Sequence, residues 1–142
     1  MKISARNVFK GKITGIQLGA VNAEVALTTA GGDRIVASVT NASVQALGLA
    51  SGKEAIALVK ASSVLVLTDS EGYQLSTRNS LSGKIASITE GPVSAEVAIA
   101  LPGGGAVHAT ITHEASKELG LKVGASATAI FKAGAVILAA KA

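Results

Sequence analysis

Hydrophobic and polar positions alternate in part over a series of short segments along the chain. These segments, rich in Val, Ile, Ala and Thr, cover residues 11–18, 20–29, 34–40, 55–59, 64–67 and 107–112. Short β-branched runs of this kind are typical of strands with one buried face. The glycine-rich stretches 31–33 and 103–105 separate neighbouring runs and predict hairpin turns. We expect 55–59 and 64–67 to form a last pair of strands around Lys60-Ala61-Ser62-Ser63.

One segment in each half of the chain departs from this strand pattern. Residues 40–48 begin with Thr40, a good N-cap, and end with Gly48, which favours the end of a helix. Residues 112–120 have the same design, from Thr112 to Gly120. We therefore predict one short helix in each half.

The two halves are copies of one unit, offset by 72 residues (83 − 11 = 72). The best matched segments are 4–7 with 76–79, 11–13 with 83–85, 21–26 with 93–98, and 47–49 with 119–121. Of 68 aligned pairs, 26 are identical, and no gap is needed. The predicted domains are residues 1–69 and 70–142, joined by a short polar segment.

About five strands and one short helix in each unit predict an all-β protein. The expected fold is two tandem OB-like Greek-key β-barrels, with a sandwich as the alternative. A unit of about 70 residues buries little surface alone, so we expect oligomers.

The composition narrows the class of protein. The formal net charge is +4, there is no Cys, and the only aromatic residues are two Phe and one Tyr. Without Cys, disulfides and thiolate metal sites are excluded. The N-terminus lacks the apolar core of a signal peptide, and no apolar run is long enough for a transmembrane helix. The sequence therefore predicts a soluble cytoplasmic protein with no membrane partner.

Candidate catalytic groups are scarce. Both histidines, His108 and His113, lie in the second unit, where the first has Val36 and Asn41. A catalytic or metal-binding histidine is not expected to be dispensable in one half of a duplication. The repeated glutamates, Glu24 and Glu96, have no second repeated carboxylate for acid–base chemistry. We therefore predict neither an enzyme nor a protein with direct metal ligands.

The polar residues that both units share are suited to an anion. They are Ser4 with Ser76, Arg6 with Arg78, Thr40 with Thr112, and Lys60 with Lys132. Guanidinium, ammonium and hydroxyl groups together are suited to a tetrahedral oxyanion. Taken singly, Lys60 could protect a strand edge, and Arg6 could form a surface ion pair with Glu24. Because the whole set recurs in both units, we favour an oxyanion site.

The ordered motifs resemble a known family. Ser-Ala-Arg-Asn, Gly-Lys-Ile, Gly-x-Val-x-Ala-Glu-Val, a Thr-started helix ending in Leu-Gly-Leu, and Lys-Ala-Ser-Ser-Val follow one another. This order resembles the Mop repeat of the molbindins, and the chain is similar to two-repeat molbindins of the ModG type. The resemblance implies an OB-like barrel and six repeats around a threefold axis, hence a homotrimer. It also implies cytoplasmic storage and homeostasis of molybdate, with tungstate as a possible second ligand, held between repeats without direct protein–metal bonds.

The resemblance also assigns residues to the oxyanion sites. Two equivalent sets are expected to bind molybdate: Ser4, Arg6, Thr40, Lys60 and Ala61, and Ser76, Arg78, Thr112, Lys132 and Ala133. A second class of sites near the threefold axis would involve Val21, Asn22, Val93 and Ser94. Because residues 62–63 are Ser-Ser and 134–135 are Gly-Ala, we expect the two sets to differ in affinity.

Two other functions fit an OB-like repeat. A nucleic-acid-binding module agrees with a pI of about 9.6, but three aromatic residues, none of them matched between the units, provide no repeated stacking platform. A regulatory part of a transporter ATPase or transcription factor would need a further domain, and the two repeats occupy all 142 residues.

Overall fold

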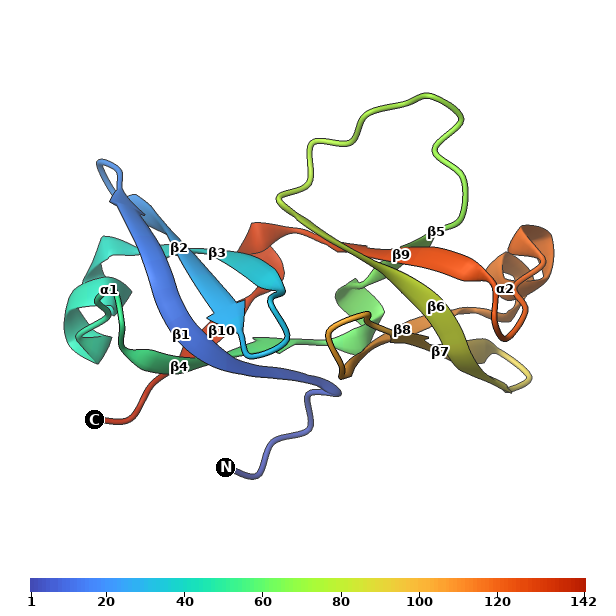
Figure 1. Ribbon diagram of the computed structural model, residues 1–142, viewed down its shortest axis with the longest axis horizontal. Coiled ribbons are helices and arrows are strands. Elements are labelled where there is room, and N and C mark those ends of the chain that lie inside the picture. The colour runs from blue at the N-terminus through green and yellow to red at the C-terminus, as the bar shows by residue number, and fades with distance from the viewer.

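The computed structural model describes all residues from 1 to 142 and contains two curled, five-stranded antiparallel sheets side by side (Figure 1). The first repeat contains β1 (Asn7–Leu18), β2 (Asn22–Thr29), β3 (Arg34–Thr40), α1 (Asn41–Leu47), β4 (Glu54–Val59), the 3₁₀ turn η1 (Ala61–Ser63) and β5 (Leu65–Leu67). The second repeat contains β6 (Asn79–Glu90), β7 (Ser94–Ala100), β8 (Ala106–Thr112), α2 (His113–Leu119), β9 (Ser126–Phe131), the 3₁₀ turn η2 (Ala133–Ala135) and β10 (Ile137–Ala139). The predicted all-β, OB-like fold is confirmed.

The two sheets exchange their last strands. The strand orders are β10-β4-β1-β2-β3 and β5-β9-β6-β7-β8. Each sheet therefore takes one edge strand from the other repeat. The outer strands of each sheet also contact each other, β10 with β3 and β5 with β8, which curls each sheet into a barrel. The sheets consequently do not coincide with the sequence repeats 1–69 and 70–142.

The predicted pairing of 55–59 with 64–67 is wrong. Leu65, Val66 and Leu67 pair instead with β9, and β4 pairs with β10. The reason is the geometry of the connection. Lys60 and Val64, on either side of η1, are both extended, so the chain runs onward to the other sheet and does not fold back in a hairpin.

Both predicted helices are present and have the predicted caps. The Thr40 hydroxyl accepts a hydrogen bond from the Ser43 N–H, and the Thr112 hydroxyl does the same for Ala115. Gly48 and Gly120 end the helices in the left-handed conformation, which glycine adopts without steric cost. The helices lie at opposite ends of the molecule (Figure 1).

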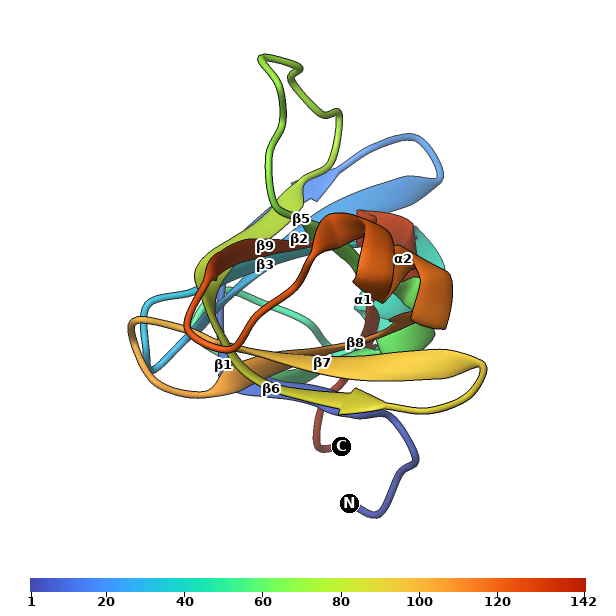
Figure 2. The same cartoon turned by 90° about the vertical axis from the view of Figure 1, so that its right-hand side faces the viewer.

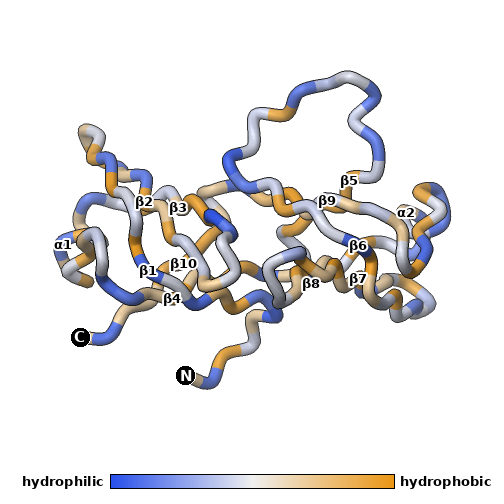
Figure 3. Tube along the Cα trace, in the orientation of Figure 1, coloured by the Kyte–Doolittle hydropathy of each residue, from blue (hydrophilic) through white to orange (hydrophobic).

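One continuous core links the two repeats. It contains 25 buried residues from both halves of the chain. Phe9 of β1 and Phe131 of β9 stack across the repeats, with ring centroids 6.5 Å apart and planes 7° from parallel. Figure 3 shows apolar stretches along the strands, whereas the connection between β5 and β6 is mostly polar. That connection stands away from both sheets in the two perpendicular views (Figures 1 and 2).

The predicted glycine turns also join the two sheets. The β2–β3 and β7–β8 turns meet backbone to backbone, and a Cβ added to Gly103 would lie 2.0 Å from the Gly31 carbonyl oxygen. A Cβ added to Gly31 would lie 2.7 Å from the Gly103 carbonyl oxygen. Only glycine therefore permits this close approach of the two turns.

Candidate functional site

A cavity of about 460 Å³ lies where the N-terminal segment, η1 and the second repeat meet. Four residues that the sequence predicts for one oxyanion site line it: Ser4, Arg6, Lys60 and Ala61. Thr110 of β8 lines it as well, with Ala135 and Ile137 from the end of the second repeat. The cavity is therefore built from both repeats.

The strand exchange brings these residues together. Since β5 joins the second sheet, the connection from β4 through η1 runs beside β8, and η1 contacts β8. Lys60 precedes η1, and its carbonyl oxygen accepts a hydrogen bond from the Ser63 N–H at 3.0 Å. This turn holds Lys60 and Ala61 at the cavity, across from Thr110.

The arginine of each set pairs with a glutamate of the other repeat. Arg6 contacts both carboxylate oxygens of Glu96, at 2.5 and 2.8 Å. Arg78 contacts both oxygens of Glu24, at 2.6 and 2.8 Å. The alternative of an Arg6–Glu24 pair within one repeat is therefore wrong. The arginine side chains remain about half exposed, at 54% and 48%, so outward-facing donors stay accessible to a ligand.

Two buried asparagines fix the positions of these arginines. The Asn7 side chain donates to the His108 carbonyl oxygen at 2.8 Å and accepts from the His108 N–H at 2.7 Å. Asn79 makes the same pair with the backbone of Val36, both bonds at 2.8 Å. Asn7 and Asn79 are 1% and 0% exposed. Each asparagine amide thus bonds to the backbone N–H and carbonyl of one residue, as a neighbouring strand would, and links its repeat to the other.

The sequence pattern alone assigns no role to these asparagines. The signal was present, because Asn follows Arg in both units and is identical between them. A polar side chain retained at the start of a strand with buried neighbours must find hydrogen-bond partners. Nothing in the sequence states that those partners belong to the other repeat.

The second set of predicted residues has equivalent contacts. Arg78 pairs with Glu24, and η2, which follows Lys132 and begins at Ala133, contacts β3. Ser76 lies in the segment that connects β5 to β6 and is exposed.

Thr40 and Thr112 are not among the residues that line this cavity. Their hydroxyls cap the helices, as described above. In the strand register Thr40 pairs with Asn22, and the N–H of Asn41 donates to the Val21 carbonyl oxygen at 2.8 Å. The structure therefore brings Thr40 together with the second class of candidates, Val21 and Asn22. The second repeat matches this arrangement, with Thr112 next to Val93 and Ser94.

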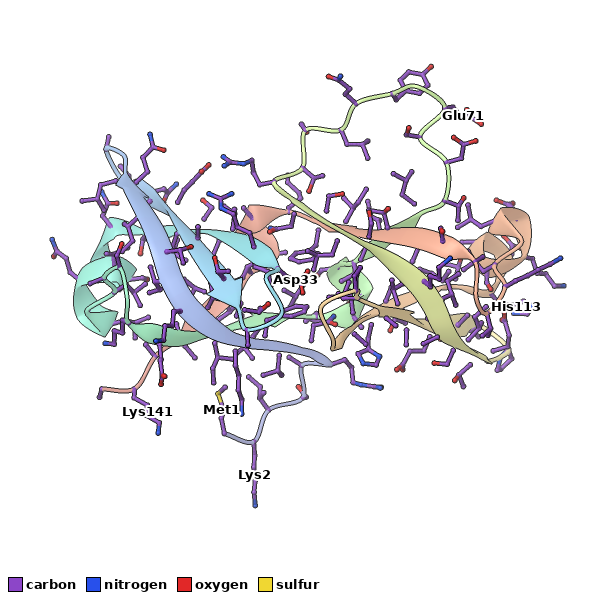
Figure 4. The ribbon with its side chains drawn as sticks, viewed as in Figure 1. Met1, Lys2, Asp33, Glu71, His113 and Lys141 are labelled. Carbon is purple, nitrogen blue, oxygen red and sulfur yellow. The ribbon has the colours of Figure 1, made fainter.

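The histidines occupy two separate environments. His113, at the α2 end of the molecule in Figure 4, has Nδ1 2.8 Å from an oxygen of Glu90. The Ser116 hydroxyl donates to the other Glu90 oxygen at 2.7 Å. The hydrogen bonds from Ser116 and then His113 lower the pKa of Glu90 from its usual value. His108 lies beside Glu96 instead, near the cavity.

No three His, Cys, Asp or Glu side chains gather in a group that could hold a metal ion. Neither helix is long or apolar enough to cross a membrane. The cavity offers cationic and hydroxyl donors together with backbone groups, and this donor set suits an oxyanion.

The chain belongs to the TOBE-domain family, whose model matches residues 3–66 and again 75–138. It is thus a tandem TOBE protein. Over 99% of this chain and 100% of the other, the fold matches a crystal structure of ModG, described as a cytoplasmic molybdate-binding protein with molybdate bound, at 54% identity and a TM-score of 0.96. The resemblance to two-repeat molbindins is confirmed.

Longer relatives contain the same pair of repeats. The molybdenum transport protein ModE of Herbaspirillum seropedicae is 45% identical over 139 residues, and the molybdenum-pterin-binding protein MopA of Rhodobacter capsulatus is 42% identical over 139. In both comparisons the alignment covers 98% of this chain and 52% of the relative. The chain therefore spans about half the length of these relatives.

Proposed function

We propose that this protein binds molybdate, and tungstate as a second ligand, for molybdenum storage and homeostasis. The observation that carries the proposal is the full-length similarity to ModG, whose structure has molybdate bound. The cavity lined by Ser4, Arg6 and Lys60 supports it, because these side chains supply the donors that an oxyanion needs.

The proposed ligands of the first site are Ser4, Arg6, Lys60 and Ala61, with Thr110 added. Their repeat equivalents in the second site are Ser76, Arg78, Lys132 and Ala133, with Ser38 at the position of Thr110. A buried dianion is costly unless opposite charges and hydrogen bonds compensate. The arginine and lysine supply the charge, and the hydroxyl and backbone N–H groups supply further bonds. Molybdate carries its own oxygen ligands, so the protein needs no direct bond to the metal.

Several features of the proposal go beyond these residues. We infer a binding protein and not an enzyme, located in the cytoplasm, with 1–69 and 70–142 as its domains. The assembly is a homotrimer of six repeats. Thr40, Val21 and Asn22, with Thr112, Val93 and Ser94, form the second class of sites, near the threefold axis.

The nucleic-acid alternative has little support from the surface. Phe9 and Phe131 stack against each other in the core, and Tyr73 is the one exposed ring. Because single-stranded nucleic acids stack on exposed aromatic rings, the surface lacks such a platform. We therefore prefer oxyanion binding.

The test is native mass spectrometry combined with calorimetric titration of the full chain with molybdate in a large excess of sulfate. Uptake in discrete steps by a trimer is the expected result. Lys60→Ala should weaken one class of sites by about tenfold or more, since it removes a full charge from the cavity. The matched control is Lys10→Ala, which removes an exposed lysine of β1 outside the cavity. A protein that takes up no molybdate, or a Lys60 variant that binds like the control, refutes the proposal.

A further inference from the structure

The two repeat-related sites differ at one side chain beside the arginine–glutamate pair. In the first site His108 of β8 lies near Glu96. The equivalent position near the second pair is Val36, which is 1% exposed. Both sites have an asparagine that bonds to the backbone of the other repeat, and both have an arginine–glutamate pair. Among the titratable groups beside these pairs, the difference is therefore a single ring.

The imidazole is placed to act on the glutamate. His108 Nδ1 is buried, has no hydrogen-bond partner, and lies 3.7 Å from the Glu96 Oε1 atom. That same oxygen contacts Arg6 at 2.5 Å. A protonated imidazole would thus share the carboxylate that Arg6 now holds.

The elements packed against β8 bring few charged groups to His108. Glu96 is the only titratable residue of β7, and Arg6 reaches it from the segment before β1. Lys60 precedes η1, which contacts β8. β5, also in contact with β8, carries no titratable side chain. The titratable residues of α2 begin at His113, beyond the end of β8.

Resting on the proposed function, we infer that His108 makes the first oxyanion site respond to pH while the second does not. With His108 neutral, Arg6, Lys60 and Glu96 sum to +1 (1 + 1 − 1), and a proton on the ring raises this to +2. The proton also offers Glu96 a second partner, which releases donors of Arg6 to the ligand.

The second site keeps its charge over the same pH range. Arg78, Lys132 and Glu24 sum to +1 (1 + 1 − 1), and Val36 does not titrate. Histidine side chains in general change their charge between about pH 8 and pH 5. A dianion should therefore bind the first site more tightly as the pH falls through this range, with little change at the second site.

The test is calorimetric titration of the full chain with molybdate at pH 6, 7 and 8. In the unmodified protein, one class of sites should bind roughly three- to tenfold more tightly at pH 6 than at pH 8, as expected for one added charge in a partly solvated site. H108Q keeps an N–H donor but does not titrate, so the pH dependence of that class should disappear. H113Q is the matched control for the other histidine and should keep the original profile.

The inference is overturned if the molybdate affinity of H108Q keeps the original dependence on pH. It is also overturned if the affinity of the unmodified protein is independent of pH in every class of sites. Should H108Q fail to fold, nuclear magnetic resonance of the unmodified protein decides the question. The titration midpoint of the His108 ring should move to higher pH when molybdate is added, and an unmoved midpoint overturns the inference. Absence of molybdate binding at every pH refutes the proposed function itself.

Discussion

Replacement of Asn79 by Ala should destabilise the whole protein, because this side chain ties the two repeats together. Its amide makes two hydrogen bonds of 2.8 Å with the backbone N–H and carbonyl of Val36. The side chain is 0% exposed, so water does not reach the groups that it satisfies. Asn79→Ala leaves one buried donor and one buried acceptor without partners.

The expected cost follows from these two bonds. An unsatisfied buried polar group costs about 1–3 kcal/mol, which gives roughly 2–6 kcal/mol for the pair. For a chain of this length, 1 kcal/mol corresponds to roughly 3 °C in the midpoint of thermal unfolding. Asn79→Ala should therefore lower the midpoint by about 6–18 °C.

The assay is thermal unfolding followed by circular dichroism at one fixed protein concentration, because assembly also raises the midpoint. Ser80→Ala, the exposed neighbour in β6, is the control and should stay close to the unmodified protein. Asn79→Asp keeps the acceptor for the Val36 N–H but loses the donor. It should be at least as damaging at pH 7, with partial recovery in acid when the carboxyl regains a proton. If Asn79→Ala and Ser80→Ala have the same midpoint of thermal unfolding, the hydrogen bonds between Asn79 and Val36 do not stabilise the fold.

Three further outcomes are expected. Gly103→Ala places a Cβ 2.0 Å from a carbonyl oxygen of the opposite turn, so calorimetry should find that the free energy of unfolding falls by roughly 1–3 kcal/mol. The control is Gly134→Ala, whose Cβ meets no neighbour and should have no such effect. The pKa of Glu90 is lowered in the fold, first by the Ser116 hydrogen bond, so its stabilisation is present above the usual value of 4.5 and is lost below it. The midpoint advantage of the unmodified protein over Glu90→Gln should therefore shrink as the pH falls below that value; a constant advantage contradicts this. A fragment of residues 1–69 lacks β10, so ultracentrifugation should find dimers that exchange β5, or assemblies of such dimers, and a folded monomer would contradict this.

Local features of the fold were predictable because each depends on neighbours in the sequence. Thr40 and Gly48 mark the ends of α1 by side-chain and backbone preferences that act over a few residues. The glycines of residues 31–33 and 103–105 predicted hairpin turns for the same reason. The internal repeat supported these predictions, because the same helix and turn signals occur in both units.

The exchange of β5 and β10 was not predictable from the same information. Leu65–Leu67 and Ile137–Ala139 are both short and apolar, so either sheet offers them a suitable partner. An apolar pattern specifies which face of a strand is buried and not which sheet it joins. The deciding feature is the extended backbone on either side of η1, and no residue type in that turn imposes it.

Which residues of the two repeats meet could not be predicted from the repeat comparison. The sequence groups Thr40 with Arg6 and Lys60 because all three recur in both units. In the fold, Thr40 lies beside Asn22 at the end of a hairpin, whereas Thr110 of the other repeat reaches the cavity. A repeat comparison finds which residues are retained, but it does not show which copies of them meet.

The exchange explains why the cavity needs two repeats. If β5 returned to its own sheet, η1 would not run along β8, and Lys60 would be separated from Thr110. Arg6 depends on the other repeat as well, since β7 supplies the Glu96 carboxylate. The same exchange places a titratable ring beside one arginine–glutamate pair and a valine beside the other. Duplication within one chain thus allows two sites of identical framework to diverge in charge, which a symmetric pair of separate single-repeat chains could not do.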